Sequence, residues 1–152
     1  MRFCASRSSS RRPTQITNPA PNYEQTWNWK ENIRVGSKLY KEKQLLAKKL
    51  LDTHPPYTDD MLERETYTRW NGGSYYHWDA ANKKWGVSDD VLCDTKTGNM
   101  GWDPDLKANS GKSESDLHER DKDSYKDGKS GQTADHPWKY SGICYANHVE
   151  GN

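Results

Sequence analysis

The sequence predicts a mainly α fold with two main helices, followed by a small irregular or β extension at the C-terminal end. Three observations support this class. Apolar residues recur at helical spacing across 28–52, a capped and acidic helix start follows at Thr58, and short aromatic segments replace the helical period after Gly73. The chain has 152 residues, enough for one domain of ordinary size.

The first predicted helix covers residues 28–52. Its apolar stripe follows a period near 3.6, through Trp29, Ile33, Tyr40, Ala47 and Leu50. Asn28 is suited to cap its beginning, because a short side-chain oxygen can accept from the first free backbone amides. His54-Pro55-Pro56 should end it, since proline cannot continue a helix.

The second predicted helix begins after Thr58, and Asp59 and Asp60 suit the positive end of its dipole. It should run to Trp70 and stop at Asn71-Gly72. The connection between the two helices is short, which predicts a helical hairpin or a steep crossing.

Short aromatic segments follow, and Ser74–Trp78 with Lys84–Val87 could form a small β-hairpin. Residues 91–94 could add an edge segment. Residues 110–130 hold eleven charged residues, which predicts a solvated loop, an exposed helix around 113–120, or disorder. Residues 136–145 are apolar again, and we expect them to dock on the aromatic region.

Three regions are predicted along the chain. Residues 1–14 are rich in Arg and Ser and lack the apolar core of a secretory signal. They could be a disordered leader or an organellar transit peptide. Residues 15–79 contain both predicted helices, and residues 80–152 form the irregular extension.

Composition excludes some classes of partner. There are 23 basic and 22 acidic residues, a net charge of +1, so no global field would recruit nucleic acid. No apolar run approaches the roughly 20 residues that a membrane span needs. Apolar residues make up only 31 % of the chain, and its mean hydropathy is −1.27. Some of the chain is therefore expected to lack a packed core.

The cysteines are Cys4, Cys93 and Cys144, and they contain no Cys-x-x-Cys pair, which argues against a zinc site. A disulfide between Cys93 and Cys144 would close a long loop and restrict the unfolded chain. Two free buried thiols are the alternative. No phosphate-binding or dinucleotide-binding glycine motif is present, and no cofactor or metal is predicted.

The stretch Arg69–Asp79 packs four aromatic residues around Gly72-Gly73. Adjacent glycines favour a tight turn, because glycine reaches positive φ at little cost. Trp and Tyr have flat apolar faces with polar tips. The stretch is either a loop that presents an aromatic wall or a turn whose aromatics fill a small core.

The order of three motifs is more specific than any one of them. Gln15-Ile16-Thr17 is followed by Asn32-Ile33 with Gly36, and then by Trp70-Asn71-Gly72-Gly73. This order resembles the second half of the lysozyme-like lytic transglycosylases of the SLT type. The resemblance covers residues 15–79 and implies a partial lysozyme-like fold in the predicted helices.

The resemblance also implies a function. Such enzymes cleave the β-1,4 bond between N-acetylmuramic acid and N-acetylglucosamine in peptidoglycan, with one Glu as general acid. The signature that carries this Glu is absent, as in a truncated chain or a natural pseudoenzyme, so no catalytic residue is predicted. We expect glycan contacts from Gln15, Trp70, Asn71, Gly72, Tyr75 and Tyr76.

The resemblance further implies a bacterial periplasmic, extracellular or delivered protein, with a possible protein partner in a secretion or phage assembly. The alternative is a non-enzymatic structural or interaction subunit of a larger assembly, which the low apolar content favours.

Overall fold

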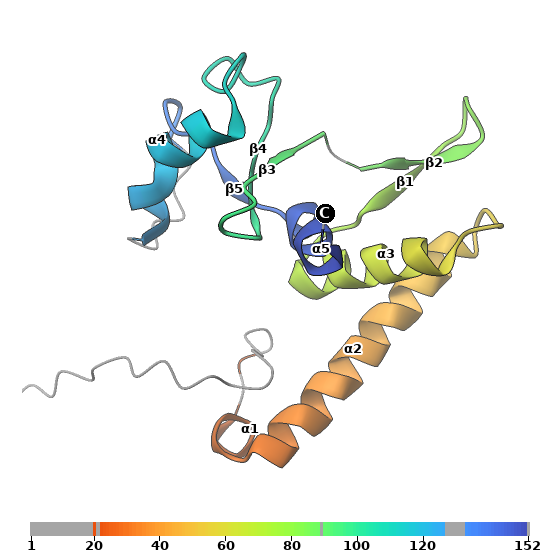
Figure 1. Ribbon diagram of the computed structural model, residues 1–152. Coiled ribbons are helices and arrows are strands. Elements are labelled where there is room, and N and C mark those ends of the chain that lie inside the picture. Colours follow the sequence, from red (N-terminus) through yellow and green to blue (C-terminus); the bar gives the residue numbers. More distant parts are fainter. Residues whose placement is uncertain (1–19, 21, 89, 127–132, 152) are drawn as a thin grey trace, which may run out of the picture. The chain divides into compact units, whose positions relative to one another are not determined.

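The computed structural model describes residues 20, 22–88, 90–126 and 133–151. They form helices with two small antiparallel sheets, so the predicted helix-rich class is confirmed (Figure 1). By contacts the chain divides into two units, residues 1–42 and 43–152. The boundary falls inside the longest helix. No described helix is both long and apolar enough to cross a membrane.

The first unit contains the short helix α1 (Tyr23–Trp27) and the beginning of α2 (Trp29–Leu51). Asn28 accepts hydrogen bonds from the backbone amides of Lys30 and Glu31, which confirms its predicted role as the cap. Arg34 makes a two-pronged contact with Glu31 one turn earlier.

The second unit begins with the end of α2, where Ala47 and Leu51 are fully buried. Helix α3 (Asp59–Asn71) follows, and the Thr58 hydroxyl accepts from the Met61 amide, as expected for its cap. The segment that connects α2 and α3 contacts two tryptophans that follow α3 in the chain. The Trp85 indole N–H donates to the His54 carbonyl at 3.0 Å, and the His54 ring stacks on Trp78.

The next element is the predicted hairpin, β1 (Tyr76–Asp79) paired with β2 (Lys84–Val87). In its turn, the Asp79 carboxylate accepts from the amides of Ala81 and Asn82. A second sheet has the order β3-β4-β5, from β3 (Leu92–Cys93), β4 (Met100–Trp102) and β5 (Lys139–Tyr140). The predicted segment 91–94 is therefore an edge strand.

Helix α4 (Glu114–Lys126) occupies most of the charged region, and residues 127–132 lie outside the described ones. The helical alternative is thus the one observed. The expectation of simple exposure is wrong in part, because Leu117 and Asp121 are fully buried on this helix. Leu117 packs with Trp102 and Trp138 in the first of two core clusters.

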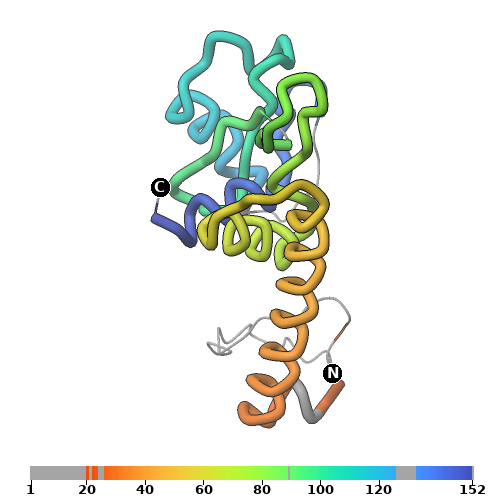
Figure 2. The backbone as a smooth tube through the Cα atoms, turned by 90° about the vertical axis from the view of Figure 1, so that its right-hand side faces the viewer, coloured from red at the N-terminus to blue at the C-terminus, as the bar shows by residue number. Residues whose placement is uncertain are grey.

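The second core cluster joins the chain's middle to its end. Helix α5 (Gly142–Glu150) lies beside α3 in both views (Figures 1 and 2). Tyr75 packs here against Ile143 and Ala146. The predicted docking of the C-terminal segment on the aromatic region is therefore confirmed.

Candidate functional site

The Trp-Asn-Gly-Gly motif forms the tight turn that ends α3. Asn71 is the last helical residue, and Gly72 and Gly73 have φ of +100° and +108°. Side chains other than glycine rarely adopt this region. The two glycines therefore let the chain reverse at once and enter the hairpin.

A buried carboxylate fixes this turn. One oxygen of Glu65 accepts the backbone amides of Tyr75 and Tyr76, at 2.8 and 3.0 Å. The other accepts the Ser74 hydroxyl at 2.8 Å and lies 2.7 Å from the Arg69 guanidinium. Glu65 is fully buried, so the two amides and the hydroxyl replace water around its oxygens. The carboxylate thus sets the position of residues 72–76.

The segment between β5 and α5 faces this turn. Ser141 caps α5 by accepting the Cys144 amide, and its carbonyl accepts from the Asn71 side chain at 3.4 Å. A Cβ on Gly142 would meet the carbonyl oxygens of Gly72 and Thr68. Only glycine allows the two backbones to approach this closely.

A pocket of about 120 Å³ lies between the turn and this segment. Its lining includes a serine on each side, Ser74 and Ser141, and Tyr140 beside it is 60 % exposed. The full lining is Thr68, Gly72, Gly73, Ser74, Lys139, Tyr140, Ser141, Gly142 and Ile143. Among these described residues there is no carboxylate.

The Ser74 hydroxyl can serve the pocket only as a hydrogen-bond acceptor. Its single proton is directed to Glu65 and the Tyr76 carbonyl, both within 3.1 Å. Its oxygen lone pairs are therefore what it can offer to a molecule in the pocket.

Five of the six predicted contact residues divide into three groups. Gly72 lines the pocket, and Asn71 borders it through its bond to Ser141. Trp70 and Tyr76 are half-buried and do not belong to the lining. Gln15 lies outside the described residues.

Tyr75 is 8 % exposed, and its hydroxyl donates to Asn147 of α5 at 2.8 Å. Its ring therefore fills the core, which is the alternative that the sequence left open. The adjacent Tyr76 packs on it, with ring centroids 4.6 Å apart. Burial, together with the nearby Tyr75 hydroxyl and Asp60, raises the pKa of Tyr76 to about 12.

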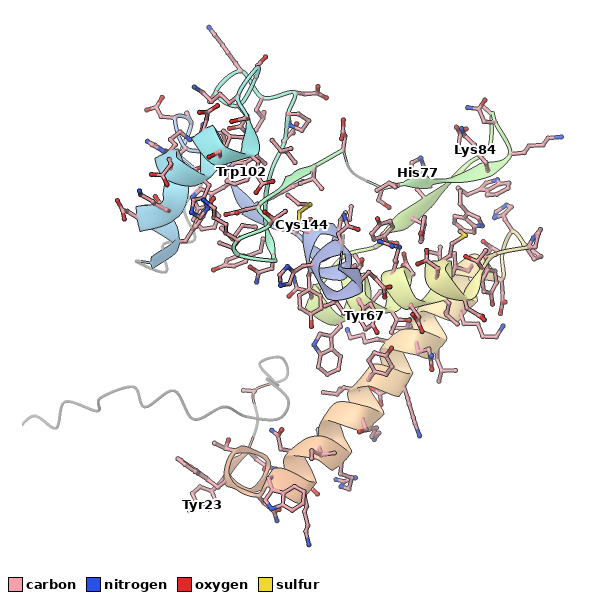
Figure 3. The ribbon with its side chains drawn as sticks, viewed as in Figure 1. Tyr23, Tyr67, His77, Lys84, Trp102 and Cys144 are labelled. Carbon is pink, nitrogen blue, oxygen red and sulfur yellow. A yellow bond between two sulfur atoms is a disulfide. The ribbon has the colours of Figure 1, made fainter. Side chains whose placement is uncertain are left out.

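The disulfide Cys93–Cys144 joins β3 to α5, so the predicted pairing is confirmed (Figure 3). It packs tightly, because a Cβ on Gly101 of β4 would lie 2.6 Å from a Val91 methyl and 2.9 Å from the Cys144 sulfur. The link holds α5 to the sheet just beyond the pocket.

A second polar cluster surrounds α4. Asp121 accepts the Trp102 indole N–H at 2.8 Å, the Arg120 guanidinium and, at 2.9 Å, a ring nitrogen of His136. Burial favours the neutral acid, but these hydrogen bonds outweigh it and lower the pKa of Asp121. Asp94, also buried, pairs with His118 at 2.7 Å. These contacts hold α4 on the sheet.

Metal binding finds no support at either cluster. Within the described part of the chain, no three His, Cys, Asp or Glu side chains are arranged to hold an ion.

Comparison with protein-family models, curated proteins and solved structures gives no match to this chain.

Sequence reasoning missed the side of the pocket formed by Lys139, Tyr140 and Ser141. The available signal was the renewed apolar character of 136–145, which predicted contact with the aromatic region but not which residues would meet the turn. Glu65 was also missed, because an acidic residue in a helix is ordinarily solvated.

Proposed function

We propose that this chain binds glycan strands of peptidoglycan at the pocket between the Gly72–Ser74 turn and the Lys139–Ile143 segment. One observation carries the proposal: the two glycines of the Trp-Asn-Gly-Gly motif, which resembles the last signature of the lytic transglycosylases, line a polar pocket beside an exposed aromatic residue. The resemblance supplies the substrate class.

The chemistry of the pocket suits a sugar. A pyranose needs hydrogen-bonding partners for its hydroxyl and acetamido groups and a flat apolar surface for its ring. Ser74 offers acceptor lone pairs, the turn offers backbone groups, and Tyr140 offers a ring face. The pocket is small, so it would take one substituent or the edge of one residue while the strand runs along the surface.

The proposal is recognition without cleavage. The family reaction needs a carboxylic acid that can give its proton to the leaving oxygen. Glu65 is behind the pocket, but it is occupied by the amides of Tyr75 and Tyr76, the Ser74 hydroxyl and Arg69. Its oxygens are already engaged and it does not line the pocket, so this carboxyl group is not placed to protonate a glycan bound there.

The proposed location follows from the partner. Peptidoglycan lies outside the cytoplasm, so we propose a periplasmic, extracellular or delivered protein of bacterial origin. A structural disulfide is typical of such oxidising compartments.

Co-sedimentation with purified peptidoglycan tests the proposal. We expect retention of the wild-type protein and a loss on the order of tenfold in affinity for Tyr140→Ala, because an exposed ring that stacks on a ligand contributes roughly 1 to 2 kcal/mol. Tyr23→Ala is the matched control, since Tyr23 is also highly exposed but lies in the first unit. No retention, or equal retention of both variants, would refute the proposed site.

Product analysis tests the absence of cleavage. Incubation with the same peptidoglycan should release no 1,6-anhydro-muropeptides above the buffer control. Release that disappears in Glu65→Gln would assign a catalytic role to Glu65 and overturn the non-enzymatic proposal.

A structural or interaction role is the second candidate function. It is favoured by a separate observation, the exposed aromatic side chains of α1 and α2.

A further inference from the structure

Four large apolar side chains are exposed at the start of the described chain. Tyr23 is 76 % exposed, Trp27 70 %, Trp29 61 % and Ile33 39 %. They lie within eleven residues on α1 and the first turns of α2, and we call them the aromatic end. The Tyr23 ring points away from both helices (Figure 3). The Tyr23 and Trp27 rings have centroids 6.3 Å apart, and grouped exposed apolar side chains mark interaction sites rather than ordinary surface.

A basic stripe follows the apolar one along α2. Trp29, Ile33 and Tyr40 share a helix face, and Lys30, Arg34 and Lys41 are each the next residue, so the cations lie about 100° around the helix. Glu31 and Glu42 lie farther around, on the opposite side. Lys30 and Lys41 therefore border the apolar face, and Arg34 does so while its guanidinium is paired with Glu31.

The helix as a whole is locally basic in a nearly neutral chain. Helix α2 contains seven Lys and Arg residues and two Glu residues, for a net charge of +5. The complete chain has a net charge of only +1. A partner with a complementary charge would therefore be anionic, and it would contact α2 and not the rest of the chain.

We propose that the aromatic end and the basic stripe of α2 form a binding surface for an anionic phospholipid bilayer. The helix would lie in the interface plane, with Trp27, Trp29 and Ile33 at the level of the upper acyl chains. Trp and Tyr suit this boundary because one side of the ring system is apolar and the other carries a polar group.

The basic side chains complete the match. The Lys30 ammonium nitrogen lies over the Trp29 ring, 5.6 Å from its centroid, so a cation and an apolar ring of the proposed surface are adjacent. From this position the ammonium can reach a lipid phosphate. Ile33 favours lipid over single-stranded nucleic acid, because an aliphatic side chain gains little from stacked bases but much from acyl chains. The inference does not depend on the proposed glycan site.

Vesicle co-sedimentation tests the inference with the full chain. We expect binding to phosphatidylcholine vesicles that contain phosphatidylglycerol, a weaker interaction with phosphatidylcholine alone, and a blue shift of tryptophan fluorescence on binding. Trp27→Ala with Trp29→Ala should reduce partitioning at least tenfold. Lys30→Glu should reduce it about fivefold on the anionic vesicles.

Matched controls come from the second unit. Tyr140→Ala should leave vesicle binding unchanged, and Tyr23→Ala should weaken it. The expectation for peptidoglycan is the reverse, because there Tyr140→Ala should weaken binding and Tyr23→Ala should not. Lys107→Glu, also an exposed lysine, is the control for Lys30→Glu. These positions are exposed, and a circular dichroism spectrum checks each fold. Added inorganic phosphate should reduce vesicle binding no more than chloride does at equal ionic strength.

Three results would overturn the inference. These are no partitioning into either vesicle, equal partitioning of the Trp27/Trp29 variant and the wild type, or binding to a single-stranded oligonucleotide but not to vesicles. The last result would assign the surface to nucleic acid.

Discussion

The carboxylate of Glu65 accepts the backbone amide of Tyr75 at 2.8 Å across ten residues of sequence. This bond connects the middle of α3 to the residue that begins the aromatic core. It also means that the glycine turn between them is held from inside the protein, and its conformation does not depend on a ligand.

Glu65→Gln should destabilise the protein by about 3 kcal/mol. Glutamine has one acceptor oxygen in place of two, and the half-buried Arg69 loses its ion-pair partner. Urea unfolding measures the difference. Glu63→Gln on the exposed side of the same helix is the control and should change stability by less than about 0.5 kcal/mol. Equal effects at the two positions would contradict the role of Glu65.

Gly142→Ala should cost about 2 to 3 kcal/mol. Its new methyl group would meet backbone carbonyl oxygens of Thr68 and Gly72, which cannot move without shifting the end of α3. Thermal unfolding reports the loss. The comparison is Gly111→Ala, where φ is +69° but nothing lies within 4 Å, so only about 1 kcal/mol of backbone strain is expected. A smaller loss at Gly142 than at Gly111 would refute the close crossing.

Reduction of the Cys93–Cys144 disulfide should lower stability by about 4 kcal/mol. The bond spans 51 residues, and release of a loop of this length increases the entropy of the unfolded chain. Unfolding of the wild type with and without reductant measures the effect. The double variant Cys93→Ser, Cys144→Ser should be as stable as the reduced wild type, and its stability should not change with reductant. If reductant destabilises the variant as much as the wild type, the effect does not come from this disulfide.

Acid should weaken the protein partly through Asp121. Its pKa is lower in the folded protein than in the unfolded chain, so its contribution is present above the ordinary Asp range, near pH 4, and is lost as the pH falls through the lowered value. Asp121→Asn should destabilise the protein at neutral pH by roughly 2 to 4 kcal/mol. It should also flatten the loss of stability on acidification.

The measurement is urea unfolding from neutral pH to below about pH 4. Asp105→Asn, at an exposed position, should follow the wild-type curve. If Asp121→Asn also runs parallel to the wild type, the ionised carboxylate does not stabilise α4.

Local features of this fold could be predicted from neighbouring residues. Asn28 and Thr58 cap their helices through amides two or three residues away, and the strands of the hairpin are separated by a short polar turn. Such features depend on a few adjacent side chains. The disulfide was also accessible, because Cys93 and Cys144 were the only pair outside the N-terminal region.

Long-range features were not accessible in the same way. Nothing in the sequence around Glu65 indicates that it will be buried by residues 74–76 instead of solvated. The pairing of Gly142 with Gly72 joins positions seventy residues apart, and neither glycine differs locally from a turn residue. The buried Asp121 was hidden in a strongly charged segment, where composition predicts solvation. From the sequence, therefore, only the side of the site formed by the turn could be predicted.

The covalent bond between β3 and α5 also determines what a protease could release. A single cut anywhere between positions 93 and 144 would leave two fragments tied to one another through sulfur. They would migrate as one species on a non-reducing gel and separate only after thiol treatment. The last eight residues of the chain, together with the rest of α5, would thus stay with the N-terminal fragment after such a nick.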